Sequence, residues 1–202
     1  MSTIKKLVIF GATGNTGLAT VSKAIEQGFE VTAFVRDSSK LPSDLKVNST
    51  VIGDVTNGED VDKAVEGQDA VIIVLGTRTD LGPTTVMSDG ARNIVASMKK
   101  FGVKRISVCI SAFLFWEPEK IPPPVMNIHQ DHLRMEKVIK ESELDWIILC
   151  PPHIDNGDGK GNYKLVKESG VGPKISKHDL GDSLIKVLLT DEYLNSRIGL
   201  GY

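Results

Sequence analysis

Short apolar runs alternate along the chain with longer stretches in which apolar residues recur every three or four positions. The runs cover residues 4–10, 31–35, 50–52, 70–75, 106–110 and 146–150. Each is short enough for one β-strand, whereas the spacing of Leu18, Val21 and Ile25 is typical of an amphipathic helix. The pattern therefore predicts strands and helices in regular alternation.

Glycine and proline mark the expected helix boundaries. Gly28, Gly67 and Gly102 each follow a helical period, which is where a helix commonly ends. Pro83 is expected to open the helix before Gly102, because its missing N–H costs nothing in a first turn. Further helices are expected around 133–139 and over 179–189. Residues 195–202 carry no motif and are expected to be loosely held.

Repeated strand–helix–strand units predict a Rossmann fold of the α/β class, with a doubly wound, mostly parallel sheet and helices on both faces. The 202 residues are enough for one such domain, spanning 1–202, and too few for two. Ligands bind such sheets at the carboxyl ends of the strands. The loops 77–83, 112–124 and 151–172 follow strands, so they are expected to build the site.

Composition narrows the class of partner. Hydrophobic residues make up 41% of the chain and charged residues 25%, and the net charge is -2 without a block of like charges. These values indicate neither nucleic acid nor an anionic membrane as a partner. The start of the chain has no signal-peptide pattern, and the two cysteines, Cys109 and Cys150, are too few for a disulfide framework. We expect reduced, buried thiols and a cytoplasmic protein.

A glycine-rich turn joins the first predicted strand to the first predicted helix. Gly11 allows a tight turn, Gly14 lets the backbone approach a pyrophosphate, and Gly17 permits close helix packing. The start of the helix adds free N–H groups and the positive end of its dipole. Such a turn can serve packing alone, but in this context it predicts a bound dinucleotide. The expected contacts within the turn also include Thr13, Asn15 and Thr16.

The residue that ends the second strand bears on the choice of dinucleotide. This residue is Arg36. An acidic residue at this position would accept hydrogen bonds from the ribose of NAD. A guanidinium instead suits a 2′-phosphate, and Ser39 and Lys40 can add donors. The sequence therefore predicts NADPH, with the reservation that Asp37 could itself face a ribose.

Two further strand ends are expected to contact the cofactor. Asp54 could accept a hydrogen bond from the adenine amino group while Val55 covers the ring, although Asp54 is equally well explained as a turn former. Leu75 and Gly76 end the fourth strand, where a glycine lets the backbone pass close to a ribose.

Several motifs in combination resemble a known family. They are Gly-Ala-Thr-Gly-Asn-Thr-Gly at 11–17, Gly-Thr-Arg at 76–78, Ser-Ala-Phe-Leu at 111–114, Asp-His-Leu-Arg-Met at 131–135, Pro-Pro-His-Ile at 151–154 and Ile-Ser-Lys-His-Asp-Leu-Gly at 175–181. The chain resembles the atypical short-chain dehydrogenases/reductases, and among them the NADPH-dependent flavin and biliverdin reductases. This resemblance implies hydride transfer to a flavin such as FMN or riboflavin, or to biliverdin during heme breakdown.

The resemblance also implies roles for individual residues. Ser111 and His153 would be catalytic and face the acceptor, although His153 can also be explained as a hydrogen-bonded loop histidine. Arg78 could bind carboxylates of a bilin or a flavin phosphate, and Phe113 and Trp116 could supply apolar surface. Further cofactor contacts would come from Arg78, Met87, Cys109, His132, Pro152, His153 and Ile154.

The proton-transfer residues usual in the larger family are not where that family has them. Tyr163 and Lys167 have the Tyr-x-x-x-Lys spacing, but they follow the sixth strand, and the helix that should hold the tyrosine contains His132 instead. Tyr163 is therefore not expected to be catalytic. A ketone needs a firm proton donor on reduction, whereas a conjugated flavin or bilin spreads the incoming charge, so this absence favours a planar acceptor.

Two alternative functions remain open. A sugar-nucleotide epimerase or carbonyl reductase of the same broad family is disfavoured by the lack of a placed tyrosine, and a non-catalytic NADP sensor would tolerate that lack. His129 and His132 could share a helix face as metal ligands do, but no third ligand pattern accompanies them, so no metal is expected. No feature of the sequence argues for a dimer, and a monomer is expected.

Overall fold

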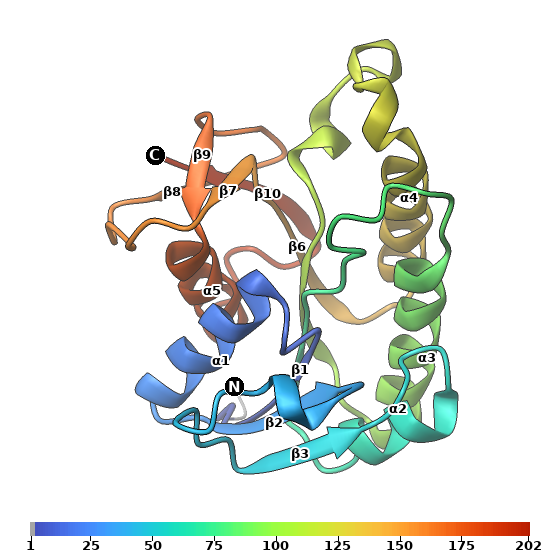
Figure 1. The fold of residues 1–202 in the computed structure, drawn as a ribbon, viewed down its shortest axis with the longest axis vertical. Coiled ribbons are helices and arrows are strands. Elements are labelled where there is room, and N and C mark those ends of the chain that lie inside the picture. Colours follow the sequence, from blue (N-terminus) through green and yellow to red (C-terminus); the bar gives the residue numbers. More distant parts are fainter. Residues whose placement is uncertain (1–2) are drawn as a thin grey trace.

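A computed structural model describes residues 3–202 and has a central eight-stranded sheet in the order β3-β2-β1-β4-β5-β6-β10-β8 (Figure 1). Six of these strands are the predicted ones and pair in parallel. They are β1 (Lys6–Phe10), β2 (Glu30–Val35), β3 (Ser49–Ile52), β4 (Ala70–Ile73), β5 (Arg105–Cys109) and β6 (Asp145–Cys150). The chain order reverses between β1 and β4, which creates a crevice at their carboxyl ends.

Helices cover both faces of the sheet. α1 (Asn15–Glu26) and α5 (Lys177–Lys186) lie on one face, and α2 (Gly58–Val65), α3 (Val86–Phe101) and α4 (Met126–Lys140) lie on the other. Short 3-10 turns span 38–40, 112–115, 118–120, 123–125 and 187–189. The predicted doubly wound fold is confirmed.

The strands are apolar on both faces because each face is covered by helices. In β1, Val8 and Phe10 pack in the cluster that includes α2, α3 and α4, whereas Leu7 and Ile9 pack in the cluster that includes α1 and α5. All four side chains are completely buried. Burying an aliphatic or aromatic side chain stabilises the fold by roughly 1.5–3 kcal/mol, so the continuous apolar run suits a central parallel strand.

The carboxyl-terminal segment is a strand, so the expectation that residues 195–202 are loosely held is wrong. β10 (Ser196–Gly201) lies between β6, to which it is parallel, and β8 (Lys164–Lys167), to which it is antiparallel. Ile198 and Leu200 are completely buried. The alternation of apolar and other residues in this segment rests on these two residues alone. That is too short a pattern to predict a strand from the sequence.

The structure also corrects the start of α3, which begins at Val86 rather than at Pro83. The Asp131 side chain of α4 supplies the cap, because the Met87 N–H donates to its Oδ2 at 3.0 Å. Asp131 is completely buried and pairs with Arg134 at 3.2 Å. A cap that comes from another helix leaves no local signal in the sequence.

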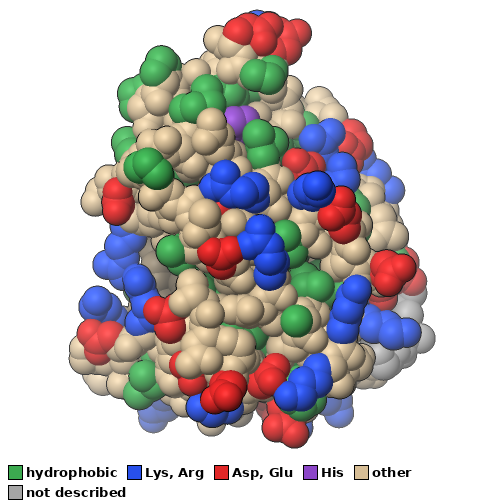
Figure 2. Space-filling view, turned by 90° about the vertical axis from the view of Figure 1, so that its right-hand side faces the viewer, with side chains coloured by type: hydrophobic (Ala, Val, Ile, Leu, Met, Phe, Trp, Pro, Cys, Tyr) green, Lys and Arg blue, Asp and Glu red, His purple; other side chains and the backbone are tan. Residues whose placement is uncertain are grey.

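The molecular surface in Figure 2 carries acidic and basic side chains side by side, with small apolar areas scattered among them. Among residues 3–202, no helix combines the length and apolar character that a bilayer crossing requires.

Candidate functional site

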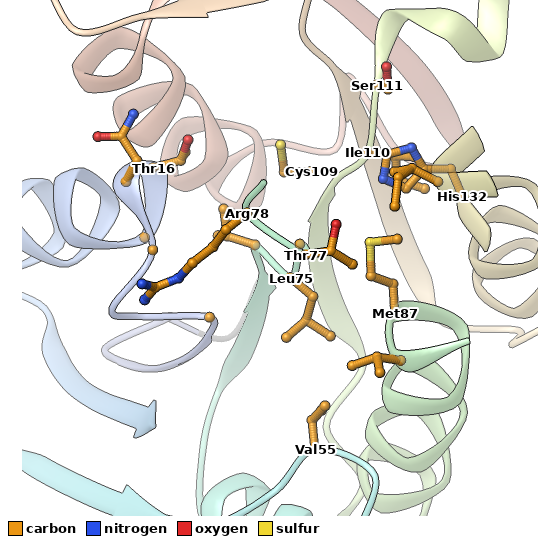
Figure 3. Close-up of a pocket in the computed structure, with 18 of the residues that line it drawn as sticks. Thr16, Val55, Leu75, Thr77, Arg78, Met87, Cys109, Ile110, Ser111 and His132 are labelled. Carbon is orange, nitrogen blue, oxygen red and sulfur yellow. The ribbon is translucent and has the colours of Figure 1, made fainter. Parts of the chain in front are cut away.

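A cavity of about 770 Å³ opens at the carboxyl ends of the central strands. Its walls come from the glycine turn after β1, the ends of β2, β4 and β5, the start of α3 and one side of α4. Figure 3 shows Val55 at one end of this cavity and Ser111, Ile110 and His132 at the other. Of the predicted loops, 77–83 contributes Thr77, Arg78, Thr79 and Leu81 to this lining, whereas 112–124 and 151–172 contribute one residue each, Phe113 and Ile154.

The glycine turn is shaped so that side chains would not fit. Gly11 has a φ of +84°, and a Cβ atom added to it would lie 2.3 Å from the Val74 carbonyl oxygen. A Cβ atom on Gly17 would lie 2.0 Å from the Gly11 carbonyl oxygen. Both contacts are impossible, which confirms the packing reasons given for these two glycines.

The turn also leaves room and donors for a diphosphate. Gly14 is the N-cap of α1, and no side chain caps the helix, so the first N–H groups of α1 are available to an anion. A Cβ atom on Gly76 would meet nothing within 4 Å, although Gly76 lines the cavity. Backbone donors beside open space fit the pyrophosphate and ribose of a dinucleotide.

The end of β2 separates the roles of Arg36 and Asp37. Arg36 is exposed and lines the cavity. The Asp37 carboxylate instead accepts hydrogen bonds from the Ser39 N–H at 3.0 Å and the Ser39 hydroxyl at 2.7 Å, and it lies 3.8 Å from Lys40. It thereby caps the short turn that follows. The structure does not bring Ser39 and Lys40, which we expected to help bind the cofactor, to the cavity wall.

Asp54 is both a turn former and a cavity residue, so the two explanations offered for it are compatible. Its carboxylate accepts from the Thr56 N–H at 2.9 Å and the Thr56 hydroxyl at 2.7 Å, and these bonds hold its pKa below the ordinary value. Val55 and Leu75 line the cavity and meet α3 at Gly90, where an added Cβ would lie 2.8 Å from Val55.

Arg78 lies close to the glycine turn. Its φ of 59° is in the left-handed region, which costs a non-glycine residue free energy and is often found at functional sites. Its guanidinium is 3.5 Å from the Thr13 carbonyl oxygen, and Figure 3 shows the side chain pointing toward the turn. The positive charge is therefore placed for a phosphate at the turn rather than for the far end of the cavity.

The far end of the cavity is mostly apolar. Figure 3 shows Ile110, Ser111 and His132 there, with Met87 and Cys109 on the way to them, and Phe113 is hydrogen-bonded to Ser111. The Ser111 hydroxyl oxygen accepts from the Phe113 N–H at 3.2 Å, which orients it at the end of β5. Burial raises the pKa of the Cys109 thiol to about 12, so this cysteine remains a neutral thiol. Cys150 is also buried.

Three further predicted site residues, Pro152, His153 and Trp116, do not line the cavity. Ile154 lines the cavity from β7 (His153–Asp155), which pairs with β9 (Lys174–Ser176). Side chains alternate along a strand, and His153 is exposed. Trp116 is 49% exposed and packs edge-on against Phe113, with the ring centres 5.0 Å apart.

Tyr163, which was not expected to be catalytic, lies outside the cavity lining. Its hydroxyl donates to the Asp182 carboxylate of α5 at 2.6 Å. Burial and this carboxylate raise its pKa well above the ordinary value.

His129 was considered in the sequence only as a metal ligand, yet it lines the cavity beside His132. Burial lowers the pKa of both imidazoles, that of His132 to about 4, so both are neutral near pH 7. The signal that could have found His129 is its position one helical turn before His132. Within residues 3–202 there is no group of three side chains that could hold a metal ion.

Comparison with known proteins places the chain in a family. A family described as NAD(P)H-binding matches residues 11–191. The chain belongs to this family. It is accordingly an NAD(P)H-binding protein with the fold that dehydrogenases, reductases and epimerases share.

The chain covers a different share of the length of each relative. An uncharacterised chloroplastic protein of Arabidopsis thaliana is 30% identical over 93% of this chain and 73% of its own length. An undecaprenol-linked N-acetylglucosaminyl 4-epimerase of Escherichia coli is 28% identical over 82% of this chain, which spans only 54% of that enzyme.

Solved structures show the same fold. A short-chain dehydrogenase/reductase of Veillonella parvula in complex with NADP has a TM-score of 0.81 and 16% identity. The alignment covers 99% of this chain and 95% of that one. At this identity the likeness concerns the fold alone.

Proposed function

We propose that this protein is an NADPH-dependent reductase that transfers a hydride to a planar, conjugated acceptor, either a flavin such as FMN or riboflavin, or biliverdin. The observation that carries the proposal is one continuous cavity with a phosphate-binding turn on one side and an apolar end with Ser111 on the other. The motifs quoted above, which resemble flavin and biliverdin reductases, support the same function.

Arg36 supports NADPH over NADH. It is an exposed cation on the cavity wall at the end of β2, and Asp37, which could have bound a ribose, is held by Ser39. A guanidinium donates paired, charge-assisted hydrogen bonds to a phosphate. Arg78 adds a second cation beside the glycine turn.

The far end of the cavity supports a planar acceptor. Phe113, Met87 and Ile110 provide apolar surface there, and the lining contains no tyrosine. When bound, NADPH would supply a hydride, which carries two electrons, and would become NADP⁺. The acceptor would take this hydride and one proton from solvent and would thereby be reduced. The residues of the chain hold the two rings together, so proximity supplies most of the rate.

The test is turnover with FMN. Purified protein is expected to oxidise NADPH only when FMN is present, and to do so more slowly with NADH, as followed by the loss of nicotinamide absorbance under anaerobic conditions. Binding of NADPH without turnover of FMN or biliverdin would instead indicate a sensor.

A sugar-nucleotide epimerase is the second candidate, favoured by the similarity to the Escherichia coli epimerase. Epimerisation interconverts two sugar isomers and leaves the total amount of reduced nicotinamide unchanged. Interconversion of an N-acetylglucosaminyl diphospholipid by this protein, without net oxidation of NADPH, would replace the reductase proposal.

A further inference from the structure

His129 is a buried histidine on the cavity wall whose environment inside the protein does not explain it. It lies on α4 with Val125 just before the helix and Ile128 beside it, and all three line the cavity. Only 6% of its surface is exposed. Its Nδ1 atom is buried and has no hydrogen-bond partner among residues 3–202, and the same is true of the His132 Nδ1 atom.

Within residues 3–202 only five buried side-chain polar atoms lack a partner, and two of them are the Nδ1 atoms of His129 and His132 on the cavity wall. A buried polar atom without a partner destabilises a fold, and such atoms are rare in native proteins. Asp131, two positions further along α4, shows how the same helix satisfies a structural polar group: it accepts from the Met87 N–H and pairs with Arg134. The unsatisfied imidazole of His129 therefore points to a partner that comes from outside the chain.

The chemistry of that partner follows from the charges around the ring. Burial outweighs the nearby Glu136 carboxylate and lowers the pKa of His129, and His132 on the same helix is neutral as well. A neutral imidazole offers one N–H donor and one nitrogen acceptor. It suits a carbonyl or ring nitrogen, whereas the cations Arg36 and Arg78 at the other side of the cavity suit phosphates.

The position of His129 separates it from the residues that face a phosphate. Figure 3 shows Val55 at one end of the cavity, Thr16 and Arg78 on the side of the glycine turn, and Ser111 and His132 at the other end. His129 lies one helical turn before His132, toward Val125. It shares this part of the wall with apolar side chains that suit a planar ring.

We propose that His129 is an acceptor-binding residue, which forms a hydrogen bond with a carbonyl or ring-nitrogen atom of a planar heterocyclic acceptor and thereby determines which acceptors are reduced. This inference rests on the proposed reductase function and names the group that recognises its second substrate. His132, one helical turn further along α4, lies at the same end of the cavity as Ser111.

The experiment compares His129→Leu, His129→Gln and the unaltered protein with FMN as the acceptor. Loss of one hydrogen bond is expected to raise the KM for FMN roughly tenfold in His129→Leu, while kcat changes less and the Kd of NADPH, measured by calorimetry, stays the same. His129→Gln retains an amide donor and acceptor and is expected to recover most of the affinity. Gln130→Leu places the same side chain at the exposed neighbouring position of α4 and is expected to change nothing.

The melting temperature distinguishes a binding role of His129 from a structural role, because a structural role predicts that substitution lowers it. Because Leu removes an unsatisfied buried nitrogen, His129→Leu is expected to melt at the same temperature as the unaltered protein or higher. A lower melting temperature together with an unchanged KM for FMN would overturn the inference. If His129→Leu does not fold, His129→Gln and His129→Asn carry the comparison.

A direct measurement of FMN binding tests this inference separately from the proposed reductase function. The Kd of FMN is measured by quenching of its fluorescence in the presence of NADP⁺. Failure of turnover with both FMN and biliverdin, together with His129-dependent FMN binding, would sink the reductase proposal but not the acceptor site. Turnover that proceeds equally well in His129→Leu would sink the acceptor site alone, and absence of binding of both FMN and biliverdin by the unaltered protein would sink both.

Discussion

At the end of β2, two neighbouring side chains of opposite charge have different surroundings. Asp37 is occupied by Ser39 and Lys40, whereas Arg36 extends along the cavity wall. At the other end, His129 and His132 are neutral because the protein buries them. Single residues thus give the cavity a cationic end for phosphate and a neutral end for a conjugated ring.

Replacing Arg36 is expected to change the cofactor preference. In Arg36→Ala the Kd of NADPH should rise roughly tenfold, because a charge-assisted hydrogen bond to the 2′-phosphate is lost at an exposed site. The Kd of NADH should stay nearly constant. Calorimetry with both nucleotides measures the ratio. Lys40→Ala is the control, since Lys40 does not line the cavity, and equal losses for both nucleotides would contradict the role of Arg36.

His132 is expected to make the fold sensitive to mild acid. Burial lowers its folded-state pKa to about 4, below the value of about 6.5 in an unfolded chain. Between these values the unfolded chain binds the additional proton, so stability falls as the pH drops through this window. By pH 5 the loss from this residue is roughly 2 kcal/mol, which corresponds to a fall of about 4–8 °C in the melting temperature.

Melting curves between about pH 7 and pH 5 measure this effect above the range in which most carboxylates are protonated. His132→Gln should flatten the dependence, and His178→Gln, which alters a histidine outside the cavity lining, should leave it unchanged. An identical slope in the His132 variant would show that burial does not hold its imidazole neutral.

At the scale of elements, close contacts between backbones hold the site together. α1, which begins with the glycine turn, packs against α5 at Gly181, where an added Cβ would lie 2.9 Å from the Thr20 nitrogen and 3.0 Å from the Ala19 carbonyl carbon. α3 packs on Val55 and Leu75 through Gly90. The orientation of the helices that surround the cofactor cavity therefore depends on the absence of side chains at a few contacts.

Gly181→Ala is expected to destabilise the fold by roughly 1–3 kcal/mol, because α5 must move away from α1 to accept the methyl group. The melting temperature should fall by about 3–10 °C. Gly58→Ala is the matched control: this glycine begins α2, and its added Cβ would approach nothing closer than the Asn93 Oδ1 at 3.9 Å. Equal melting temperatures for the two variants would show that α1 and α5 do not pack this closely.

At the scale of the whole molecule, the two ends of the chain stabilise the same sheet. β1 pairs with β2 and β4 at its centre, and β10 joins β6 to the antiparallel strand β8. The Tyr202 hydroxyl donates to the buried Asp179 carboxylate at 2.6 Å, and the same carboxylate accepts from the Lys160 N–H at 2.7 Å. The last strand therefore ties the loop after β7 to the start of α5.

Deletion of residues 196–202 is expected to prevent stable folding, because it removes the buried side chains Ile198 and Leu200 and detaches β8 from the sheet. Circular dichroism and thermal melting of the truncated chain measure the loss. Deletion of Tyr202 alone leaves β10 intact and should lower the melting temperature by only a few degrees. A truncated chain that melts cooperatively at the original temperature would contradict the place of β10 in the sheet.

The order of the first six strands, the helices between them and the glycine turn were predictable from the sequence, because their signals are local: apolar period, chain reversal at glycine, and a turn in which Gly11 and Gly17 have no space for a side chain. Most of the predicted cofactor residues line the cavity for the same reason, since strand ends in a parallel sheet meet at one edge.

Only the tertiary structure decided which of several adjacent residues reach the cavity. Ile154 lines it and His153 does not, and Arg36 lines it while Lys40 is held by Asp37. These outcomes depend on strand pairing and on contacts between distant residues. The cap of α3 by Asp131, the burial of His129 and the placement of β10 also arise from partners far away in the chain, and such partners leave no periodic signal in the residues themselves.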